Sequence, residues 1–136
     1  LTEEEFAVMK THVDHGVDIV RHSRWLDDAA PVVGGHHEKF DGGGYPRGLS
    51  GEDIPMGARI FAVVDVFDAL TSRRPYKEPM PFAKAMAIIG GDSGRHFDPA
   101  VVAAFTRIAE DLHARLSASG DDELRAAVLA ATTAYF

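Results

Sequence analysis

The sequence predicts an all-α fold, because no segment alternates apolar and polar side chains with the two-residue period of a half-buried strand. In several segments apolar side chains recur instead at steps of three and four residues, the period of an amphipathic helix. The chain has 136 residues, 46% of them hydrophobic, and this length predicts a single domain, 1–136, with a substantial core.

The first expected helix begins at Thr2 and ends at about His22. Thr2 and Glu5 have the spacing of a capping box, in which each side chain bonds the backbone N–H of the other residue. A stripe of apolar residues follows at helical spacing, namely Phe6, Met9, Val13, Val17 and Val20. This combination predicts both the start of the helix and its apolar face.

A second helix is expected to begin after Asp27 or Asp28 and to include His36 and His37. Gly34 and Gly35 weaken it by about 1 kcal/mol each relative to Ala, which indicates close packing at these positions. The segment after it, about 39–55, is rich in glycine and has no helical period, so it is expected to be a long surface loop. Loops of this length in compact domains often carry function.

The remaining elements are also expected to be helical. From Pro55 or Met56 the sequence is apolar nearly all round, which predicts a central, buried helix that ends at 73–75. A shorter helix is expected over 81–89, followed by a second glycine-rich loop, GGDSGRHFDP. Asp98 in this loop can cap a helix from Pro99 to about residue 116, and a last helix covers 122–133.

Composition excludes several classes of protein. The formal net charge of −7 argues against a surface for nucleic acid polymers or anionic membranes. The absence of cysteine excludes disulfides and thiolate metal sites. No apolar stretch in this segment approaches the roughly 20 residues that span a bilayer. These features predict a cytoplasmic location.

Four residues are candidates for metal ligands. Adjacent side chains on a helix point about 100° apart, so His36 and His37 would suit two different metal ions; alternatively, one is a surface residue and the other a core residue. Asp65 lies in the apolar run FAVVDVF, where a carboxylate must be paired or bind a cation, and a structural ion pair is the alternative. His12 lies near the apolar edge of the first helix and is equally compatible with a core position.

A basic cluster in SRRPYK is a candidate phosphate site. It contains Arg73, Arg74 and Lys77, with Arg47 in the preceding loop. Guanidinium groups suit bidentate phosphate contacts. A solvated helix end, where cations are favoured by the helix dipole, is an equally fair interpretation of the cluster by itself.

Taken together, these segments resemble the HD-GYP family, the bacterial phosphodiesterases of cyclic di-GMP within the HD phosphohydrolase superfamily. The resemblance rests on HHEKFDGGGYPRGLSGEDIP, ARIFAVVDVFDALTSRRPYK and GRHFDP, in that order, and extends to about residue 105. It implies an HD-superfamily bundle of about five to six helices that hydrolyses a phosphodiester with two or more divalent metals. Fe or Mn is favoured, and Zn or Ni is compatible with the ligands.

The resemblance also implies roles for particular residues. The family's metal-binding positions fall on His12, His36, His37 and Asp65. Asp41 and Tyr45 belong to the signature loop beside the substrate, and Arg74 and Lys77 match the residues that hold its phosphate and guanine. The same loop is expected to contact diguanylate cyclase (GGDEF) domains.

The sequence departs from the family in one serious respect. It contains no His-Asp dipeptide and begins at Leu1, so we expect the C-terminal part of an HD-GYP domain, truncated before the HD pair and its lysine. No catalytic residue is then retained, and this segment by itself is expected to be weakly active or inactive. Exposed apolar stripes would favour a homodimer. The alternative is a non-catalytic module that docks cyclic di-GMP or a GGDEF domain.

Overall fold

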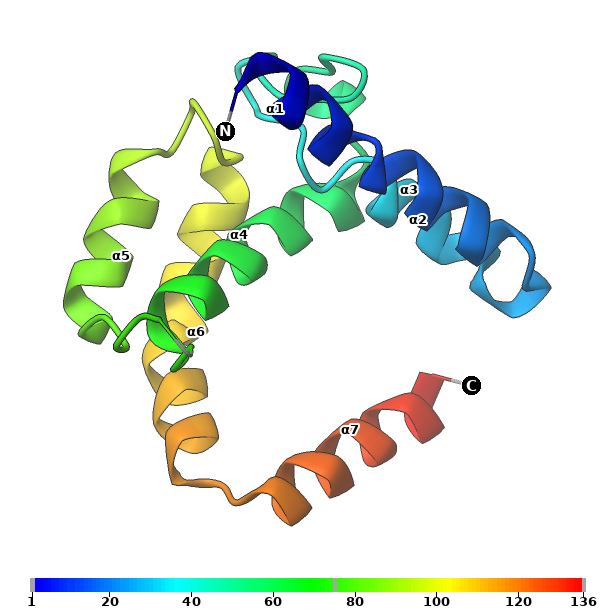
Figure 1. Cartoon of the computed structure of the whole chain (residues 1–136). Helices are drawn as coiled ribbons and strands as arrows, with labels where there is room; N and C mark the ends of the chain where they lie inside the picture. The colour runs from blue at the N-terminus through cyan, green and yellow to red at the C-terminus, as the bar shows by residue number, and fades with distance from the viewer. Residues whose placement is uncertain (1, 75, 136) are drawn as a thin grey trace. The chain divides into compact units, whose positions relative to one another are not determined.

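A computed structural model describes residues 2–74 and 76–135, and these form helices and two isolated bridges without any extended strand (Figure 1). The all-α prediction is therefore confirmed. The chain divides into two compact units, Leu1–Ala103 and Ala104–Phe136. Within the described residues, no helix is long and apolar enough to cross a membrane.

The first helix begins as predicted. Thr2 and Glu5 form the capping box: the Thr2 N–H donates to the Glu5 carboxylate at 2.7 Å, and the Glu5 N–H donates to the Thr2 hydroxyl at 3.2 Å. The predicted stretch is divided at Thr11 into α1 (Glu3–Lys10) and α2 (His12–Arg21). If this pair is taken as one broken helix, the part of the chain described has six α-helices, the upper end of the expected range.

The second helix is shorter than predicted. A 3-10 segment, Arg24–Ala29, leads into α3 (Ala30–Val33), and the helix ends at Gly34. The prediction that His36 and His37 lie on this helix was wrong. After Gly34 the chain continues as a turn, and a Cβ on Gly35 would lie 3.0 Å from the Cβ of Ala58, which fits the close packing expected at the two glycines.

The other helices lie close to the predicted positions. They are α4 (Met56–Thr71), α5 (Phe82–Gly91), α6 (Pro99–Ala118) and α7 (Asp121–Tyr135), with a short 3-10 segment, Gly51–Asp53, before α4. In the first unit α2 packs on α3, α3 on α4 and α4 on α5. Fully buried side chains in this unit include Val13, Ala58, Val63, Ala85, Ile89 and Phe97.

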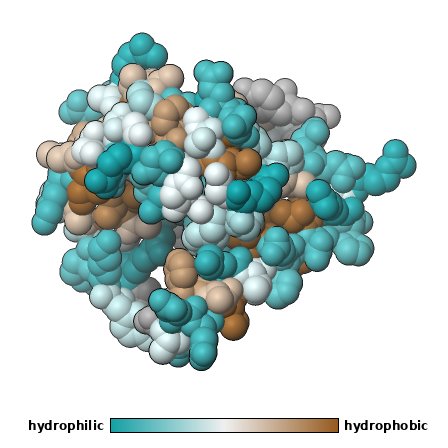
Figure 2. Space-filling view, turned by 90° about the horizontal axis from the view of Figure 1, so that it is seen from above, coloured by the Kyte–Doolittle hydropathy of each residue, from teal (hydrophilic) through white to brown (hydrophobic). Residues whose placement is uncertain are grey.

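Helix α4 is central to the first unit but is not buried on all sides. Ile60, Phe61 and Val64 are 46%, 46% and 42% exposed, and Asp65 beside them is exposed as well. The prediction of an all-round buried helix was wrong, because the described part of the chain covers only the face that carries Ala58, Ala62 and Val63. Apolar patches are also visible among mostly hydrophilic residues in Figure 2.

The two glycine-rich loops are joined by backbone hydrogen bonds. Phe40 N–H donates to the His96 carbonyl at 3.1 Å, and Asp41 N–H donates to the Arg95 carbonyl at 2.9 Å. Asp98 caps α6 as predicted, with one carboxylate oxygen accepting from the Ala100 N–H at 2.7 Å. The long loop is therefore held against a second loop rather than extending freely into solvent.

Candidate metal centre

Three of the four predicted metal ligands meet at one point. His12 is the first residue of α2, and His36 and His37 follow the end of α3. One potential ligand atom from each of the three lies within 4.8 Å of the others. Because α3 ends at Gly34, the 100° separation expected on a helix does not apply, and the rings of His36 and His37 lie with centroids 4.0 Å apart. Since the two histidines do not lie on a helix, the geometric argument that they bind two separate metal ions no longer applies.

Two of these imidazoles are oriented by a hydrogen bond between Nδ1 and a backbone carbonyl. His12 Nδ1 lies 2.6 Å from the Met9 carbonyl oxygen, and His36 Nδ1 lies 2.8 Å from that of Val33. Since a carbonyl oxygen only accepts, Nδ1 carries the proton in both rings, and Nε2 of the neutral ring keeps its lone pair. Metal-binding histidines typically make such a hydrogen bond through the other ring nitrogen. The donor set therefore fits a divalent ion.

His37 completes the group. Its Nε2 lies 3.1 Å from Nε2 of His12, and its ring stacks on Tyr45 with centroids 4.8 Å apart and planes 25° apart. Burial, followed by the neighbouring His36 and His12, lowers the pKa of His37 to about 4, whereas Asp65 acts in the opposite direction. The ring is therefore neutral at pH 7, which is the form that binds metal.

The fourth predicted ligand, Asp65, is exposed on α4 rather than buried in the apolar run. Within residues 2–74 and 76–135 it is not a member of the tight histidine group, although its carboxylate influences the pKa of His37. The neighbouring Phe61, one helical turn earlier, contacts the His36 ring at 5.8 Å between centroids. Asp65 therefore lies on the same face of α4 as the histidines, and its role as a ligand stays a prediction.

The structural ion pair that was the alternative for Asp65 is not found among the described residues, because the nearby arginines pair with other carboxylates. Arg59 pairs with Asp98 at 2.6 Å, and Arg74 lies 3.6 Å from Asp68. No ion pair of Asp65 is found in the described part of the chain. Its carboxylate remains available to a cation.

The signature loop folds back over the histidines. Asp41 accepts a hydrogen bond from the Gly43 N–H at 2.9 Å, which stabilises the turn, and the Tyr45–Pro46 peptide is cis. Tyr45 contacts His37 on one side and the edge of Phe6 on another, at 6.0 Å between centroids. Burial raises the pKa of the Tyr45 phenol. Tyr45 is thus beside the candidate metal centre, whereas its predicted contact with substrate stays a prediction.

One residue of this region was missed by sequence reasoning. Glu38 is only 2% exposed and accepts hydrogen bonds from the backbone N–H groups of Arg47 and Leu49 at 2.8 and 3.0 Å. The available signal was its position, because an acidic residue directly before a glycine-rich loop is a ready acceptor for the loop N–H groups.

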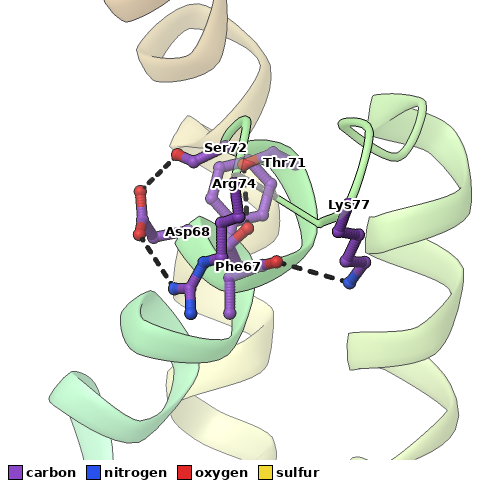
Figure 3. A network of polar contacts seen from close by, with 7 residues as sticks. Phe67, Asp68, Thr71, Ser72, Arg74 and Lys77 are labelled. Carbon is purple, nitrogen blue, oxygen red and sulfur yellow. Dashed lines mark hydrogen bonds and ion pairs between the residues drawn. The ribbon is translucent and has the colours of Figure 1, made fainter.

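The basic cluster lies at the far end of α4 (Figure 3). Lys77 Nζ donates to the Ala69 carbonyl at 3.4 Å, and Arg74 pairs with Asp68, which also accepts from the Ser72 hydroxyl. Arg73, Arg74 and Lys77 line a pocket of about 640 Å³ together with Tyr76 and Glu78. Arg47 is not part of it and lines a different pocket, beside Arg21 and Asp27.

Comparison with known proteins agrees with this arrangement. A family model described as "HD domain" matches residues 1–101. A "Cyclic di-GMP phosphodiesterase" from Vibrio cholerae is 49% identical over 117 residues, which cover 81% of this chain and 24% of that protein. A protein of the same description from Thermotoga maritima is 44% identical over 114 residues, covering 82% of this chain and 31% of that one.

A solved structure is similar as well. The crystal structure of a cyclic GMP-AMP specific phosphodiesterase from V. cholerae superimposes with a TM-score of 0.70 at 25% identity, covering 85% of this chain and 27% of that chain. The chain thus spans between about a quarter and a third of the length of these relatives.

Proposed function

The chain belongs to the HD domain family, and on that premise we propose that it forms the metal- and substrate-binding part of a phosphodiesterase of cyclic di-GMP. Family membership implies dependence on divalent metal ions. Relatives described as cyclic di-GMP phosphodiesterases support the choice of substrate. With no His-Asp dipeptide in the sequence, we propose that this chain by itself turns over little or no substrate.

The observation that carries the proposal is the convergence of His12, His36 and His37, with Nδ1 of His12 and of His36 each hydrogen-bonded to a backbone carbonyl. These residues would hold a metal, with Asp65 contributing to a further one, and Fe or Mn is favoured over Zn or Ni. When bound, such an ion polarises a phosphoryl oxygen and lowers the pKa of a coordinated water. The chain's own part is to orient His12 and His36 through their Nδ1 hydrogen bonds and to cover the ring of His37 with that of Tyr45.

The face of α4 connects this centre to the basic cluster. Phe61 touches His36, Asp65 follows one turn later, and the carbonyl of Ala69, one turn further, holds Lys77. At a rise of 1.5 Å per residue, the eight steps along the helix from Phe61 to Ala69 span about 12 Å. A cyclic dinucleotide with one phosphate at the histidines is large enough to extend its other nucleotide toward Arg74 and Lys77. This separation favours a cyclic dinucleotide over a small phosphate monoester.

The role of the cluster in this proposal is to neutralise charge. Arg74 is half exposed and its partner Asp68 is more than half exposed, so the ion pair between them is weak and screened by solvent. A phosphate can therefore compete for the guanidinium group without breaking a buried contact. Asp41 and Tyr45 would border the substrate from the loop side.

The proposal is tested by separating metal binding from nucleotide binding. His36→Ala should remove bound metal by elemental analysis, whereas Arg74→Ala should keep the metal and weaken cyclic di-GMP binding about tenfold by calorimetry. Lys84→Ala, an exposed cation on α5, is the matched control and should change neither. Unchanged metal content in His36→Ala would contradict the metal centre.

Turnover needs its own measurement, with cyclic di-GMP and cyclic GMP-AMP as substrates and added Mn or Fe. Cyclic GMP-AMP is included because the similar solved structure is described as specific for it. Rates comparable with those of an intact HD-GYP domain would contradict the proposal that this chain by itself is weakly active. Nucleotide binding that needs no metal and gives no product would favour the docking module instead.

For partners, we propose that loop 39–55 contacts a GGDEF domain and that the exposed apolar face of α4 supports a homodimer. That face presents Ile60, Phe61 and Val64 to solvent within the described part of the chain. Analytical ultracentrifugation of the chain with and without a GGDEF domain tests both points. A strict monomer at micromolar concentration would contradict the dimer.

A further inference from the structure

Glu38 is a buried carboxylate whose oxygens are both used by one loop. Oε1 accepts from the Arg47 N–H at 2.8 Å and Oε2 from the Leu49 N–H at 3.0 Å, while the residue is only 2% exposed. Among the described residues it has no basic partner within ion-pair distance. Burying a carboxylate costs free energy unless it is hydrogen-bonded. The two loop N–H groups offset this cost, and the carboxylate in turn holds the loop in place.

The same loop is fixed on the other side of Tyr45. A Cβ on Gly44 would lie 2.3 Å from the Lys39 nitrogen and 2.4 Å from the Cα of Glu38, so the two backbones are in direct contact. The Tyr45 N–H also donates to the His37 carbonyl at 3.2 Å. Tyr45 is therefore held between a close backbone contact before it and the Glu38 hydrogen bonds after it.

His37 depends on this loop more than the other two histidines do. The rings of His12 and His36 are oriented by hydrogen bonds from Nδ1 to backbone carbonyls. For His37 the described residues offer no such carbonyl, and its ring lies instead against Tyr45, at 4.8 Å between centroids. His37 also contacts His12 through Nε2 at 3.1 Å and the His36 ring at 4.0 Å between centroids, and the Tyr45 ring is the contact by which the loop orients this third imidazole.

We infer that Glu38 is a positioning residue of the metal centre: by anchoring Arg47 and Leu49 it keeps Tyr45 against His37 and so keeps the third imidazole aimed at the metal. This inference rests on the proposed function, since it assumes that the histidines bind a divalent ion. Groups that orient metal ligands in this way typically contribute 10- to 100-fold in metal affinity.

The first test is Glu38→Gln in the full chain, with Zn²⁺ alone as the probe. The amide keeps the size of the side chain but directs an NH₂ donor at one of the two loop N–H donors. We expect Zn²⁺ affinity, measured by competition with a chromophoric chelator, to fall about tenfold. Glu52→Gln changes an exposed carboxylate of the same loop and should leave the affinity unchanged.

A double-mutant cycle shows whether Glu38 acts through Tyr45. Tyr45→Leu should lower Zn²⁺ affinity by a similar factor, Tyr45→Phe should retain it, and Glu38→Gln combined with Tyr45→Leu should be no weaker than either single variant. Additive losses would overturn the inference. If Glu38→Gln fails to fold, the difference between Tyr45→Phe and Tyr45→Leu still decides whether the ring positions His37.

A measurement without metal separates this inference from the proposed function. In the metal-free chain, stacking on Tyr45 should shift the His37 ring protons upfield, and Glu38→Gln should abolish that shift in aromatic NMR spectra. An unchanged His37 signal would overturn the positioning role even if zinc binds. Conversely, loss of the shift in a chain that binds no zinc would contradict the proposed function while leaving the Glu38–Tyr45–His37 linkage intact.

Discussion

The buried ion pair between Arg59 and Asp98 makes a large and specific prediction about stability. The side chains are only 11% and 5% exposed, and their charged atoms lie 2.6 Å apart. Arg59 Nε is buried without a hydrogen-bond partner in the described structure, so Asp98 is the main compensation for the guanidinium charge. Asp98→Ala would leave that charge buried and unpaired.

The expected loss can be worked from these contacts. Removing one partner of a buried pair costs about 3–5 kcal/mol. Asp98 also caps α6 through the Ala100 N–H, which contributes about 1 kcal/mol more. We therefore expect Asp98→Ala to lower the free energy of unfolding by about 4 kcal/mol or more, a large part of the roughly 5–15 kcal/mol that stabilises a typical domain.

The assay is urea unfolding of the metal-free chain at pH 7, followed by circular dichroism. Arg95→Ala is the matched control, because Arg95 lies 2.7 Å from Asp92 but is 75% exposed, and such pairs contribute at most about 1 kcal/mol. Arg59→Met combined with Asp98→Asn removes both charges and keeps an oxygen for the cap, so it should recover most of the loss. If Asp98→Ala costs no more than Arg95→Ala, the reasoning is refuted.

Three further predictions concern the candidate site. Gly44→Ala should destabilise the chain by about 1–3 kcal/mol and weaken Zn²⁺ binding, because the new Cβ would lie 2.3 Å from the Lys39 nitrogen. Gly90→Ala, on the open side of α5, should change neither stability nor Zn²⁺ binding, and equal unfolding midpoints for the two variants would contradict the prediction. NMR titration of the folded chain should place the pKa of His37 at about 4. Because the unfolded imidazole takes up a proton near pH 6.5, the free energy of unfolding should fall as the pH drops from about 6.5 to 4. A His37 titration midpoint above about pH 6 would contradict this prediction. Asp65→Asn should lower the His37 midpoint further, because the carboxylate favours the imidazolium, and should reduce metal content by elemental analysis; unchanged metal would make Asp65 a structural residue.

Helix positions could largely be predicted from the sequence because they depend on local signals. The capping box of Thr2 and Glu5, the Asp98 cap and the apolar period each act within a few residues, and each is present in the structure. Exposure could not be predicted in the same way. The face of α4 with Ile60 and Phe61 is apolar, and only the arrangement of the other elements shows that the described chain leaves it open.

The sequence predicted which residues form the candidate site but not how they are arranged in space. The resemblance to a family selected His12, His36 and His37 from seven histidines, and the structure brings these three together. Spacing suggested that the adjacent pair would diverge, because it assumed a helix that in fact ends at Gly34. The partner of Arg59 was also beyond local reasoning, since Asp98 is 39 residues away in the sequence.

The end of α3 shows that residues unfavourable for a helix can be required by the candidate metal centre. Gly34 and Gly35 cost helix stability, yet a Cβ on Gly35 would lie 3.0 Å from that of Ala58, so a side chain at this position would require α4 to give way by a few tenths of an ångström. This close packing places the His36 ring against Phe61, on the face of α4 that also carries Asp65. A more stable helix through this segment would keep the 100° separation of His36 and His37 and carry one of them away from the centre. The residues that break the helical rule are thus those that allow two neighbouring histidines to serve one site.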